Sequence, residues 1–443
     1  MEEVENLVKA ELLNKIKNKT AILGVVGLGY VGLPLAVEAA KAGFKTIGFD
    51  TQEKRVRWVN EGRNYIGDVL DADLKKVIQE GLLCATNDFS LMKDVDAISI
   101  CVPTPLDIYQ QPDLSYVKSS TENIAKYLHK GVLVILESTT YPGTTEELVK
   151  SILEEKFNFK CGEDFFLAFS PERIDPGNLK YKMMNTPKIV GGINTISTEI
   201  AVFFYENILK SKIHIVSSPR VAEMVKIYEN IFRNVNIALV NEMAILCHKM
   251  NIDIWEVIEA AKTKPYGFMP FYPGPGVGGH CIPIDPFYLT WKAREYNYHT
   301  KFIELAGEIN RYMPEYIVER VFRILSKRFN KPLNNSKILL LGVSYKKDIG
   351  DLRESPALEI IKRLEEENAI VSYYDPYICA FVNNEKKYIS LKELTTEEIK
   401  GRDIVIIVTD HTKVNYEMIV KNAKIVFDTR NVLKIKSNKI EKL

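Results

Sequence analysis

Near its N-terminus the chain reads Gly27-Leu28-Gly29-Tyr30-Val31-Gly32. An apolar run over residues 20–26 precedes this stretch and is predicted to be a strand, and residues 33–42 follow with helical character. This is the G-x-G-x-x-G pattern in a strand–turn–helix setting, in which the glycines allow a tight turn, close approach of a pyrophosphate and close helix packing. The N-terminus of the helix would hold the phosphates. The stretch therefore predicts a doubly wound α/β fold that binds a dinucleotide.

The second predicted strand, residues 45–49, ends at Asp50, and Arg55 follows shortly after it. An acid at this position of a dinucleotide fold bonds the ribose hydroxyls of the adenosine and repels a 2′-phosphate. The sequence therefore favours NAD over NADP as the cofactor.

Polar residues follow the further strands predicted at 96–102, 132–137 and 165–169. In open parallel sheets, ligands bind beyond the carboxyl ends of the strands. Turn chemistry alone would explain some of these residues, and Glu172 with Arg173 would also be compatible with a solvated surface pair. We nevertheless expect the following strand-end residues to line the cofactor or substrate site: Thr104, Ser138, Thr139, Glu172 and Arg173.

A long helix is predicted over residues 219–248, and it is apolar nearly all round. Such a helix is usually buried, often between subunits or domains, and we expect a homodimer. Lys226, Asn230 and Asn234 recur at every fourth position along one face. This polar stripe predicts the lining of a site, and the alternative is a buried structural hydrogen-bond network.

The loop over residues 274–286 is rich in glycine and proline and delivers Cys281 to the start of a helix. Its glycines would let a bulky ligand approach the backbone. Asp285-Pro286 is typical of a helix N-cap followed by proline at the first helical position, and the positive end of that helix would favour a thiolate. The alternative is a plain turn with a small buried cysteine. The preceding aromatic segment, which includes Tyr272, would form either a wall for a flat ring such as uracil or an apolar plug.

After a linker at residues 330–336, a second alternation of strands and helices begins. Its first turn, Gly342-Val343-Ser344-Tyr345, lacks the phosphate-binding glycines. Lys346, Arg353 and Arg430 supply positive charge near strand ends, which suits a diphosphate, although plain surface charge is the alternative. We thus expect two doubly wound Rossmann-like domains, residues 1–217 and 330–443, joined by a central helical domain, residues 218–329.

Composition narrows the class of protein further. The formal net charge of +1 over 443 residues gives no global attraction to nucleic acid or to an anionic membrane. Neither a secretory signal nor a membrane-spanning run is visible, so we expect a cytoplasmic protein. The six cysteines show no C-x-x-C and no metal-ligand spacing, so we expect no metal site.

Taken together, these residues resemble the UDP-glucose/GDP-mannose dehydrogenase family over about residues 18–435. The resemblance rests on the glycine turn with Asp50 and Arg55 and on five further signatures: Val102-Pro103-Thr104-Pro105, Ser138-Thr139, Ser170-Pro171-Glu172, Glu223 to Asn230, and Gly278-Gly279-His280-Cys281-Ile282-Pro283-Ile284-Asp285. A last signature is Lys346-Lys347-Asp348-Ile349-Gly350-Asp351-Leu352-Arg353-Glu354-Ser355.

The resemblance implies a four-electron oxidation of a primary alcohol to a carboxylate by two NAD in turn. Cys281 would form a thiohemiacetal and then a thioester, while Lys226 would stabilise oxyanion charge. Asp285 would position or activate water, Asn230 would orient that water or the oxyanion, and Glu172 would assist hydrolysis. Arg353 would contribute to the cofactor site. The residues implied for the nucleotide sugar are Glu172, Arg173, Lys226, Asn230, Tyr272, Gly278, Lys346 and Arg430.

The segment 171–177 and His280, which stands where glucose and mannose members carry serine, resemble the branch acting on UDP-N-acetylhexosamines. Residues 262–270 and 285–292 most resemble UDP-N-acetylglucosamine 6-dehydrogenases, whose product would serve as a precursor of surface polysaccharide. Arg173 is a candidate contact for the acetamido group. UDP-N-acetylmannosamine and UDP-glucose stay open as substrates. A two-electron hydroxy-acid dehydrogenase and an inactive nucleotide-sugar or NAD sensor are the alternatives outside this chemistry.

Overall fold

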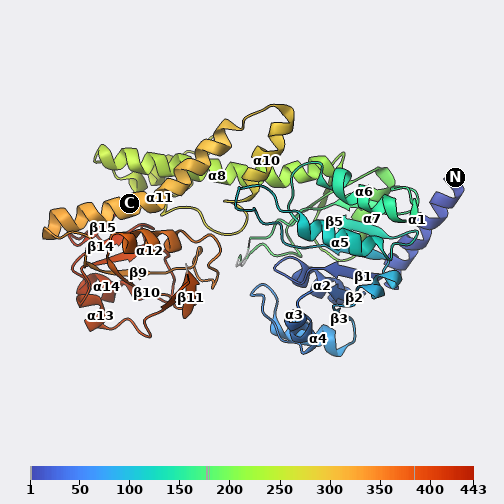
Figure 1. Cartoon of the computed structure of the whole chain (residues 1–443), viewed down its shortest axis with the longest axis horizontal. Coiled ribbons are helices and arrows are strands. Elements are labelled where there is room, and N and C mark those ends of the chain that lie inside the picture. The colour runs from blue at the N-terminus through green and yellow to red at the C-terminus, as the bar shows by residue number, and fades with distance from the viewer. Residues whose placement is uncertain (1, 176–177, 179, 384) are drawn as a thin grey trace. The chain divides into compact units, whose positions relative to one another are not determined.

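The computed structural model describes residues 2–175, 178, 180–383 and 385–443. The chain divides into two compact units. The first unit comprises residues 1–229 and 287–298, and the second comprises residues 230–286 and 299–443 (Figure 1). Each unit contains one doubly wound sheet.

In the described part of the first unit, eight strands form one sheet in the order β3-β2-β1-β4-β5-β6-β7-β8. Neighbours from β3 to β6 run parallel, whereas β7 is antiparallel to β6. The order 3-2-1-4-5-6 is that of dinucleotide-binding folds, with a switch point between β1 and β4. The strands are β1 (Ile22–Val26), β2 (Lys45–Phe49), β3 (Leu83–Thr86), β4 (Ala97–Ile100), β5 (Leu133–Leu136), β6 (Phe166–Phe169), β7 (Lys188–Gly192) and β8 (Ile213–Ile215).

Helices cover both faces of this sheet (Figure 1). In β5, Leu133 and Ile135 belong to one apolar core and Val134 and Leu136 to the other, because successive side chains of a strand point to opposite faces. The helices are α1 (Glu2–Lys17), α2 (Gly32–Lys41), α3 (Glu53–Asn60), α4 (Asp71–Gln79), α5 (Ser115–Ala125), α6 (Lys150–Phe157) and α7 (Thr195–Glu206). Short 3₁₀ and π turns lie at Phe89–Asp94 and Thr145–Val149.

The central part of the chain is helical, as predicted. The long helix α8 extends over Pro219–Lys249, α9 over Ile254–Ala261, α10 over Asp285–Ala293 and α11 over Lys301–Phe329. A 3₁₀ turn, Arg294–Tyr296, follows α10. Although α8 is apolar nearly all round, some of its large side chains are exposed, among them Leu239 with 54% of its surface accessible.

The second unit contains a five-stranded parallel sheet of order β10-β9-β13-β14-β15 among its described residues. When the strands of this sheet are numbered in chain order, their spatial order is 2-1-3-4-5. This is the other common doubly wound arrangement, and its switch point lies between β9 and β13. The strands are β9 (Lys337–Leu341), β10 (Ile370–Tyr374), β13 (Ile404–Ile407), β14 (Val426–Asp428) and β15 (Ile440–Lys442), and β11 (Ala380–Asn383) pairs with β12 (Lys386–Ile389) as a hairpin. The remaining helices are α12 (Pro356–Glu366), α13 (Thr396–Lys400) and α14 (Tyr416–Asn422).

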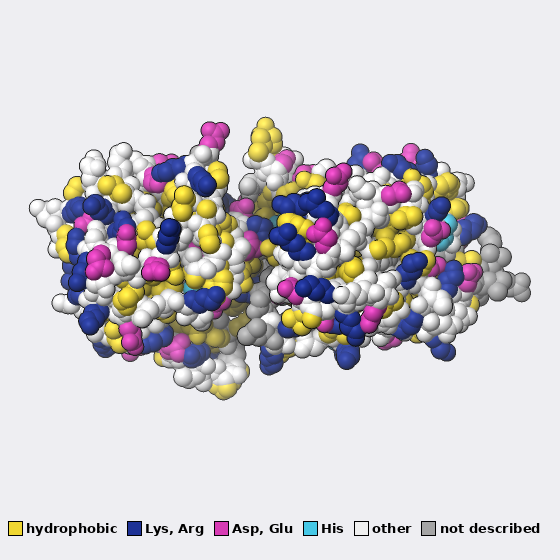
Figure 2. Space-filling view, turned by 90° about the horizontal axis from the view of Figure 1, so that it is seen from below, with side chains coloured by type: hydrophobic (Ala, Val, Ile, Leu, Met, Phe, Trp, Pro, Cys, Tyr) yellow, Lys and Arg dark blue, Asp and Glu magenta, His cyan; other side chains and the backbone are white. Residues whose placement is uncertain are grey.

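The predicted fold class is therefore confirmed: two doubly wound folds and a central helical part with a long helix. The predicted boundaries after residues 217 and 329 stay predictions, since the compact units do not follow them. Along the described parts of the chain, no helix has both the length and the apolar character needed to cross a bilayer. Figure 2 shows a face on which basic and acidic side chains are interspersed, in keeping with the net charge of +1.

Candidate functional site

The three glycines of the first turn meet three different requirements. Gly27 has a φ of +90°, and a Cβ there would lie 2.7 Å from the carbonyl oxygen of Cys101. A Cβ on Gly32 would lie 1.8 Å from the carbonyl oxygen of Gly27, so this glycine lets α2 pack against the turn. A Cβ on Gly29 would meet no atom within 4 Å. The open space at Gly29, at the entrance to α2, fits an approaching pyrophosphate.

Asp50 ties the end of β2 to this turn. Its carboxylate accepts hydrogen bonds from the backbone N–H of Leu28 at 3.0 Å and of Gln52 at 2.8 Å. Arg55 lies 3.3 Å away from it. Only 5% of the surface of Asp50 is exposed. The acid predicted to contact the ribose is thus held rigidly at the end of the second strand, and Arg55 approaches it from α3.

Thr104, Ser138 and Thr139 follow β4 and β5, as predicted. The Ser138 hydroxyl donates a hydrogen bond to the carbonyl of Val102 at 2.8 Å, which joins the two strand ends. Thr104 is buried, and its carbonyl accepts a hydrogen bond from the hydroxyl of Tyr288 in α10. Tyr30 in the glycine turn is 44% exposed. The predicted cofactor residues of the first unit therefore gather at the carboxyl edge of its sheet, around the switch point.

Glu172 and Arg173 follow β6 at the same edge. One oxygen of Glu172 accepts hydrogen bonds from the backbone N–H of Arg173 at 2.7 Å and of Ile174 at 2.8 Å. Arg173 forms an ion pair with Glu229 of α8, with Nε 3.3 Å from Oε2, and it donates to the carbonyl of Pro187 at 2.7 Å. Arg173 thus fastens this segment to α8, and its contact with an acetamido group stays a prediction. Pro176 and Gly177 of the predicted signature lie outside the described residues.

The turn that carries Cys281 begins earlier than the sequence suggested. The carbonyl of Cys281 accepts hydrogen bonds from the N–H of Ile284 at 3.2 Å and of Asp285 at 2.8 Å. The helix α10 starts at Asp285 itself, so the predicted helix start, with Asp285 as N-cap, lies one residue too late. The carboxylate of Asp285 accepts a hydrogen bond of 2.6 Å from the side-chain amide of Asn230, and both residues are buried. Cys281 itself is partly exposed.

Asparagines on one side of α8 form the buried hydrogen-bond network that was the alternative for the polar stripe, and the lining of a site stays a prediction. Asn234 donates to the carbonyl of Ile282 at 2.8 Å, and the side chain of Asn241 accepts from the N–H of Gly274 at 3.0 Å while it donates to Asn310 at 3.0 Å. These asparagines form a buried network that holds both ends of the cysteine loop. Lys226, 8% exposed, precedes Asn230 by one turn of the same helix.

The glycines of the cysteine loop face protein rather than open space. A Cβ on Gly278 would lie 2.6 Å from Cβ of Tyr345, and one on Gly274 would lie 2.7 Å from the guanidinium of Arg430. The N–H of Gly279 donates to the carbonyl of Arg353 at 2.9 Å. At these positions glycine lets the C-terminal fold pack directly on the loop. The approach of a ligand to this backbone stays a prediction.

Three further predicted residues lie in the second unit. The Arg353 side chain pairs with Asp351 at 2.7 Å, and Lys346 is partly buried in the same loop. Tyr272 is 46% exposed and stacks on Trp255 with ring centroids 6.1 Å apart. The structure thus brings Asn230, Cys281 and Asp285 together, and it packs the cysteine loop against the segments that carry Arg353 and Arg430.

Sequence reasoning missed a buried cluster at the switch point of the second sheet. His411 lies 3.0 Å from the hydroxyl of Ser344 and 3.1 Å from the carboxylate of Asp375 through Nε2, and its Nδ1 accepts from the N–H of Asp348 at 3.0 Å. Burial alone would raise the pKa of Asp375, but the hydrogen bonds from His411 and from backbone N–H groups lower it. The available signal was that Ser344, Asp375 and His411 all follow predicted strands.

Glu223, one turn before Lys226 on α8, was also missed as an individual residue. Its carboxylate accepts hydrogen bonds from the N–H and hydroxyl of Thr145, at 2.8 and 2.7 Å, and from the N–H of Gly143. Burial raises the pKa of Glu223 to about 7, against the opposing effect of these hydrogen bonds. Glu223 thus links α8 to the segment that follows Thr139.

Three family models match this chain. They are the NAD binding domain of the UDP-glucose/GDP-mannose dehydrogenase family at residues 21–209, its central domain at 220–312 and its UDP binding domain at 339–435. The chain belongs to the UDP-glucose/GDP-mannose dehydrogenase family. It is therefore an NAD-dependent oxidoreductase of nucleotide sugars, and the predicted cofactor, NAD, is confirmed.

Relatives of two substrate types are similar over most of the chain. A UDP-N-acetyl-D-glucosamine 6-dehydrogenase of Pseudomonas aeruginosa is 38% identical over 81% of this chain and 83% of its own. A UDP-N-acetyl-D-mannosamine dehydrogenase of Pyrococcus horikoshii is 36% identical over 93% of this chain and 96% of its own. The solved structure of a UDP-D-ManNAc dehydrogenase from Pyrococcus horikoshii aligns with a TM-score of 0.85 at 34% identity, covering 95% of this chain and 98% of that one.

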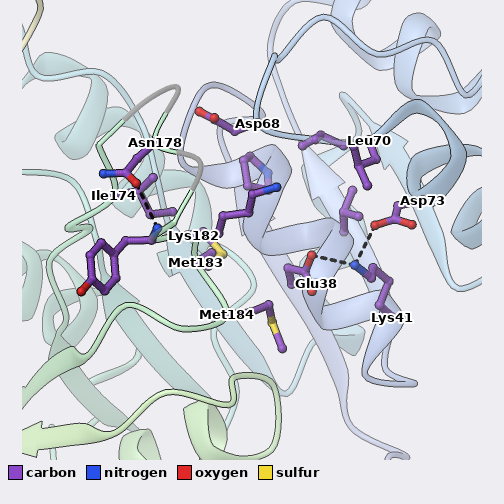
Figure 3. A pocket seen from close by; sticks show the side chains of 14 residues that line it. Glu38, Lys41, Asp68, Leu70, Asp73, Ile174, Asn178, Lys182, Met183 and Met184 are labelled. Atoms are coloured by element: carbon purple, nitrogen blue, oxygen red, sulfur yellow. Dashed lines mark hydrogen bonds and ion pairs between the residues drawn. The ribbon is translucent and has the colours of Figure 1, made fainter.

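A separate cavity of about 200 Å³ lies in the first unit beside α2 (Figure 3). Met183, Met184 and Leu70 contribute apolar walls, and Lys41 pairs with Asp73 at its rim at 2.7 Å. Among its described lining residues there is none of the predicted site residues. His, Cys, Asp and Glu side chains form no group of three or more suited to a metal ion within the described residues.

Proposed function

We propose that this enzyme oxidises the C6 alcohol of a UDP-N-acetylhexosamine to the uronic acid, with Cys281 carrying the sugar between two oxidations. The observation that carries the proposal is the single turn that joins Cys281 to Asp285. Asp285 is buried and bonded to Asn230 at 2.6 Å, so a carboxylate and an amide are fixed one turn from the thiol. This is the arrangement that nucleophilic catalysis followed by hydrolysis requires.

NAD, when bound, accepts a hydride from the substrate carbon in each oxidation. In the proposed sequence, loss of a proton and a hydride from the alcohol gives an aldehyde, to which the Cys281 thiolate adds. A second hydride leaves this thiohemiacetal and produces a thioester. Water then displaces the sulfur, which restores the thiol and releases the carboxylate.

The remaining predicted residues take roles along this sequence. Lys226 would stabilise the negative charge that develops on the sugar oxygen, because a buried ammonium acts strongly in a site from which water is excluded. Asp285, oriented by Asn230, would activate the hydrolytic water. Glu172, held by two backbone N–H groups, would assist the same half-reaction.

UDP-N-acetylglucosamine is the favoured substrate because residues 262–270 and 285–292 resemble the enzymes that act on it. UDP-N-acetylmannosamine, which differs at one stereocentre, is the second candidate. The Pyrococcus horikoshii relative and the solved structure that aligns over 95% of this chain both favour it.

The test is the yield of NADH per sugar with UDP-N-acetylglucosamine, UDP-N-acetylmannosamine and UDP-glucose side by side. We expect two NADH per molecule of one acetylated sugar, and loss of about a thousandfold or more in turnover in Cys281→Ala, as for other removed nucleophiles. Cys247→Ala, which changes another partly buried cysteine, is the matched control and should behave like the wild type. One NADH per sugar, or indifference to Cys281→Ala, would contradict the proposal.

We also propose that the enzyme is a homodimer that uses α8. Phe232, Leu239 and Leu246 are each more than 40% exposed and recur every seven residues, so they share one side of the helix. An apolar stripe of this kind is typical of an interaction surface. A cytoplasmic location stays a prediction.

A further inference from the structure

A buried lysine lies beside Glu172 in the first unit. Lys188, the first residue of β7, places Nζ 3.6 Å from one oxygen of Glu172 and 2.8 Å from the carboxylate of Glu137. Glu137 follows β5, and its second oxygen accepts a hydrogen bond of 2.8 Å from the hydroxyl of Tyr205. The Lys188 and Glu137 side chains are only 6% and 0% exposed.

The sheet topology explains why a lysine reaches this edge. Strands β5 and β6 run parallel, so Glu137 and Glu172 both lie beyond their carboxyl ends. Strand β7 is antiparallel to β6, and Phe169 is opposite Gly191. When this register is continued by three residues, Lys188 comes opposite Glu172. The amino end of the reversed strand thereby carries its lysine to the edge where the parallel strands end.

Two carboxylates, Glu137 and Glu172, lie within 4 Å of the Lys188 ammonium. Among the described residues, neither carboxylate has a second cation within 4 Å. Burial alone would lower the pKa of Lys188, but Glu137 and Glu172 outweigh burial and raise it, so the ammonium is charged at neutral pH. The other titratable neighbours, Tyr205 and Cys101, are neutral there, because burial and then Glu137 raise the pKa of each well above its usual range. Lys188 is thus the positive charge that Glu137 and Glu172 share.

We propose that Lys188 is a positioning residue that holds the Glu172 carboxylate in place for hydrolysis, and that Glu137 limits this effect by competing for the same ammonium. The proposal rests on the proposed function, in which Glu172 assists hydrolysis. An adjacent cation favours the charged form of a carboxylate, and a nearby second carboxylate disfavours it. The two neighbours of Glu172 therefore exert opposite electrostatic effects on its carboxylate.

The test measures kcat against pH, from the absorbance of NADH, with the UDP-N-acetylhexosamine that the wild type turns over. Glu137→Gln frees Lys188 for Glu172, so the acid limb of the profile should move to lower pH. The double variant Lys188→Met/Glu137→Gln removes both buried charges without leaving either one unpaired. Its acid limb should move to higher pH by about one unit, which is about a tenfold loss of kcat within the limb.

Two controls separate this effect from damage to the fold. Lys292→Met removes a lysine whose side chain is 5% exposed and that also pairs with two carboxylates, Glu147 and Glu295, in the same unit. Its acid limb should stay where it is in the wild type. Thermal unfolding of each variant establishes that the compared proteins are folded.

The two possible failures give different results. If Glu172→Gln loses the acid limb but Glu137→Gln and the double variant do not shift it in opposite directions, the inference about Lys188 is overturned while the role of Glu172 stands. If the limb persists unshifted in Glu172→Gln, the role of Glu172 in hydrolysis is overturned and the inference is overturned with it.

Discussion

At the scale of single residues, two glycines of the first turn serve different purposes. Gly32 is needed for packing within the fold, and Gly29 leaves space for the cofactor. A methyl group at Gly29 would meet open space, whereas at Gly32 it would lie 1.8 Å from a backbone oxygen. Both positions have backbone angles that alanine tolerates, since neither has a positive φ. Substitution by alanine therefore tests space alone.

We expect Gly32→Ala to lower the free energy of unfolding by about 2 kcal/mol or more, as overpacking does. We expect Gly29→Ala to change the free energy of unfolding by less than about 0.5 kcal/mol. Its Kd for NAD should rise about tenfold, equivalent to about 1.4 kcal/mol, because the methyl group would occupy the path of the pyrophosphate. Chemical unfolding without NAD and calorimetric titration with NAD measure the two effects. Unchanged NAD affinity in Gly29→Ala would contradict the assigned phosphate position.

Individual site residues could be predicted from the sequence where they form a pattern with residues nearby in the chain. Cys281 and Asp285 stand one turn apart in a loop, and Asn230 repeats on a helix face, so a pattern pointed to each. Lys188 and Glu137 carry no such pattern, because their contact depends on β7 reversing direction next to β6. The glycines at 274 and 278 were recognised as unusual, but only the packed structure shows that Arg430 and Tyr345 fill the space beside them.

At the scale of elements, the two doubly wound folds share one hydrogen-bonding arrangement, in which an acid after the second strand accepts bonds from backbone N–H groups. Asp50 follows the second strand of its sheet and accepts from the N–H of Leu28, in the turn after the first strand, and of Gln52. Asp375 occupies the equivalent place after β10 and accepts from the N–H of Val343 and of Tyr377, both at 2.8 Å. An acid at this position therefore ties two strand ends together even in a fold that lacks the phosphate-binding glycines.

The second doubly wound fold was among the elements that could be predicted from the sequence. Alternating strands and helices indicated the second fold, and the acid after its second strand was visible in the sequence. The start of α10 was predicted one residue too late, and the carboxylate of Asp285 accepts a hydrogen bond from Asn230. The hydrogen-bonded turn before Asp285 contains two isoleucines and a proline, and this composition gives no clear signal for the start of a helix.

At the scale of the whole molecule, the proposed homodimer makes its own prediction. Leu239→Glu would place a charge in the apolar stripe of α8, where burial of an unpaired carboxylate is costly. We expect this variant to sediment as a monomer at micromolar concentration while the wild type sediments as a dimer. Ile389→Glu, on β12, alters a side chain that is even more exposed and should leave the dimer intact. A wild type that is monomeric under these conditions would refute the proposed use of α8.

Cys281 is proposed to carry the sugar covalently between the two oxidations. The most direct measurement is the intact mass of Asp285→Asn, quenched in acid during turnover with NAD and the UDP-N-acetylhexosamine substrate. Because this substitution removes the carboxylate proposed to activate water, we expect the thioester to accumulate as an added UDP-sugar acyl mass that maps to Cys281. Formation of two NADH per enzyme with an unmodified Cys281, or an adduct on another residue, would contradict this role of Cys281.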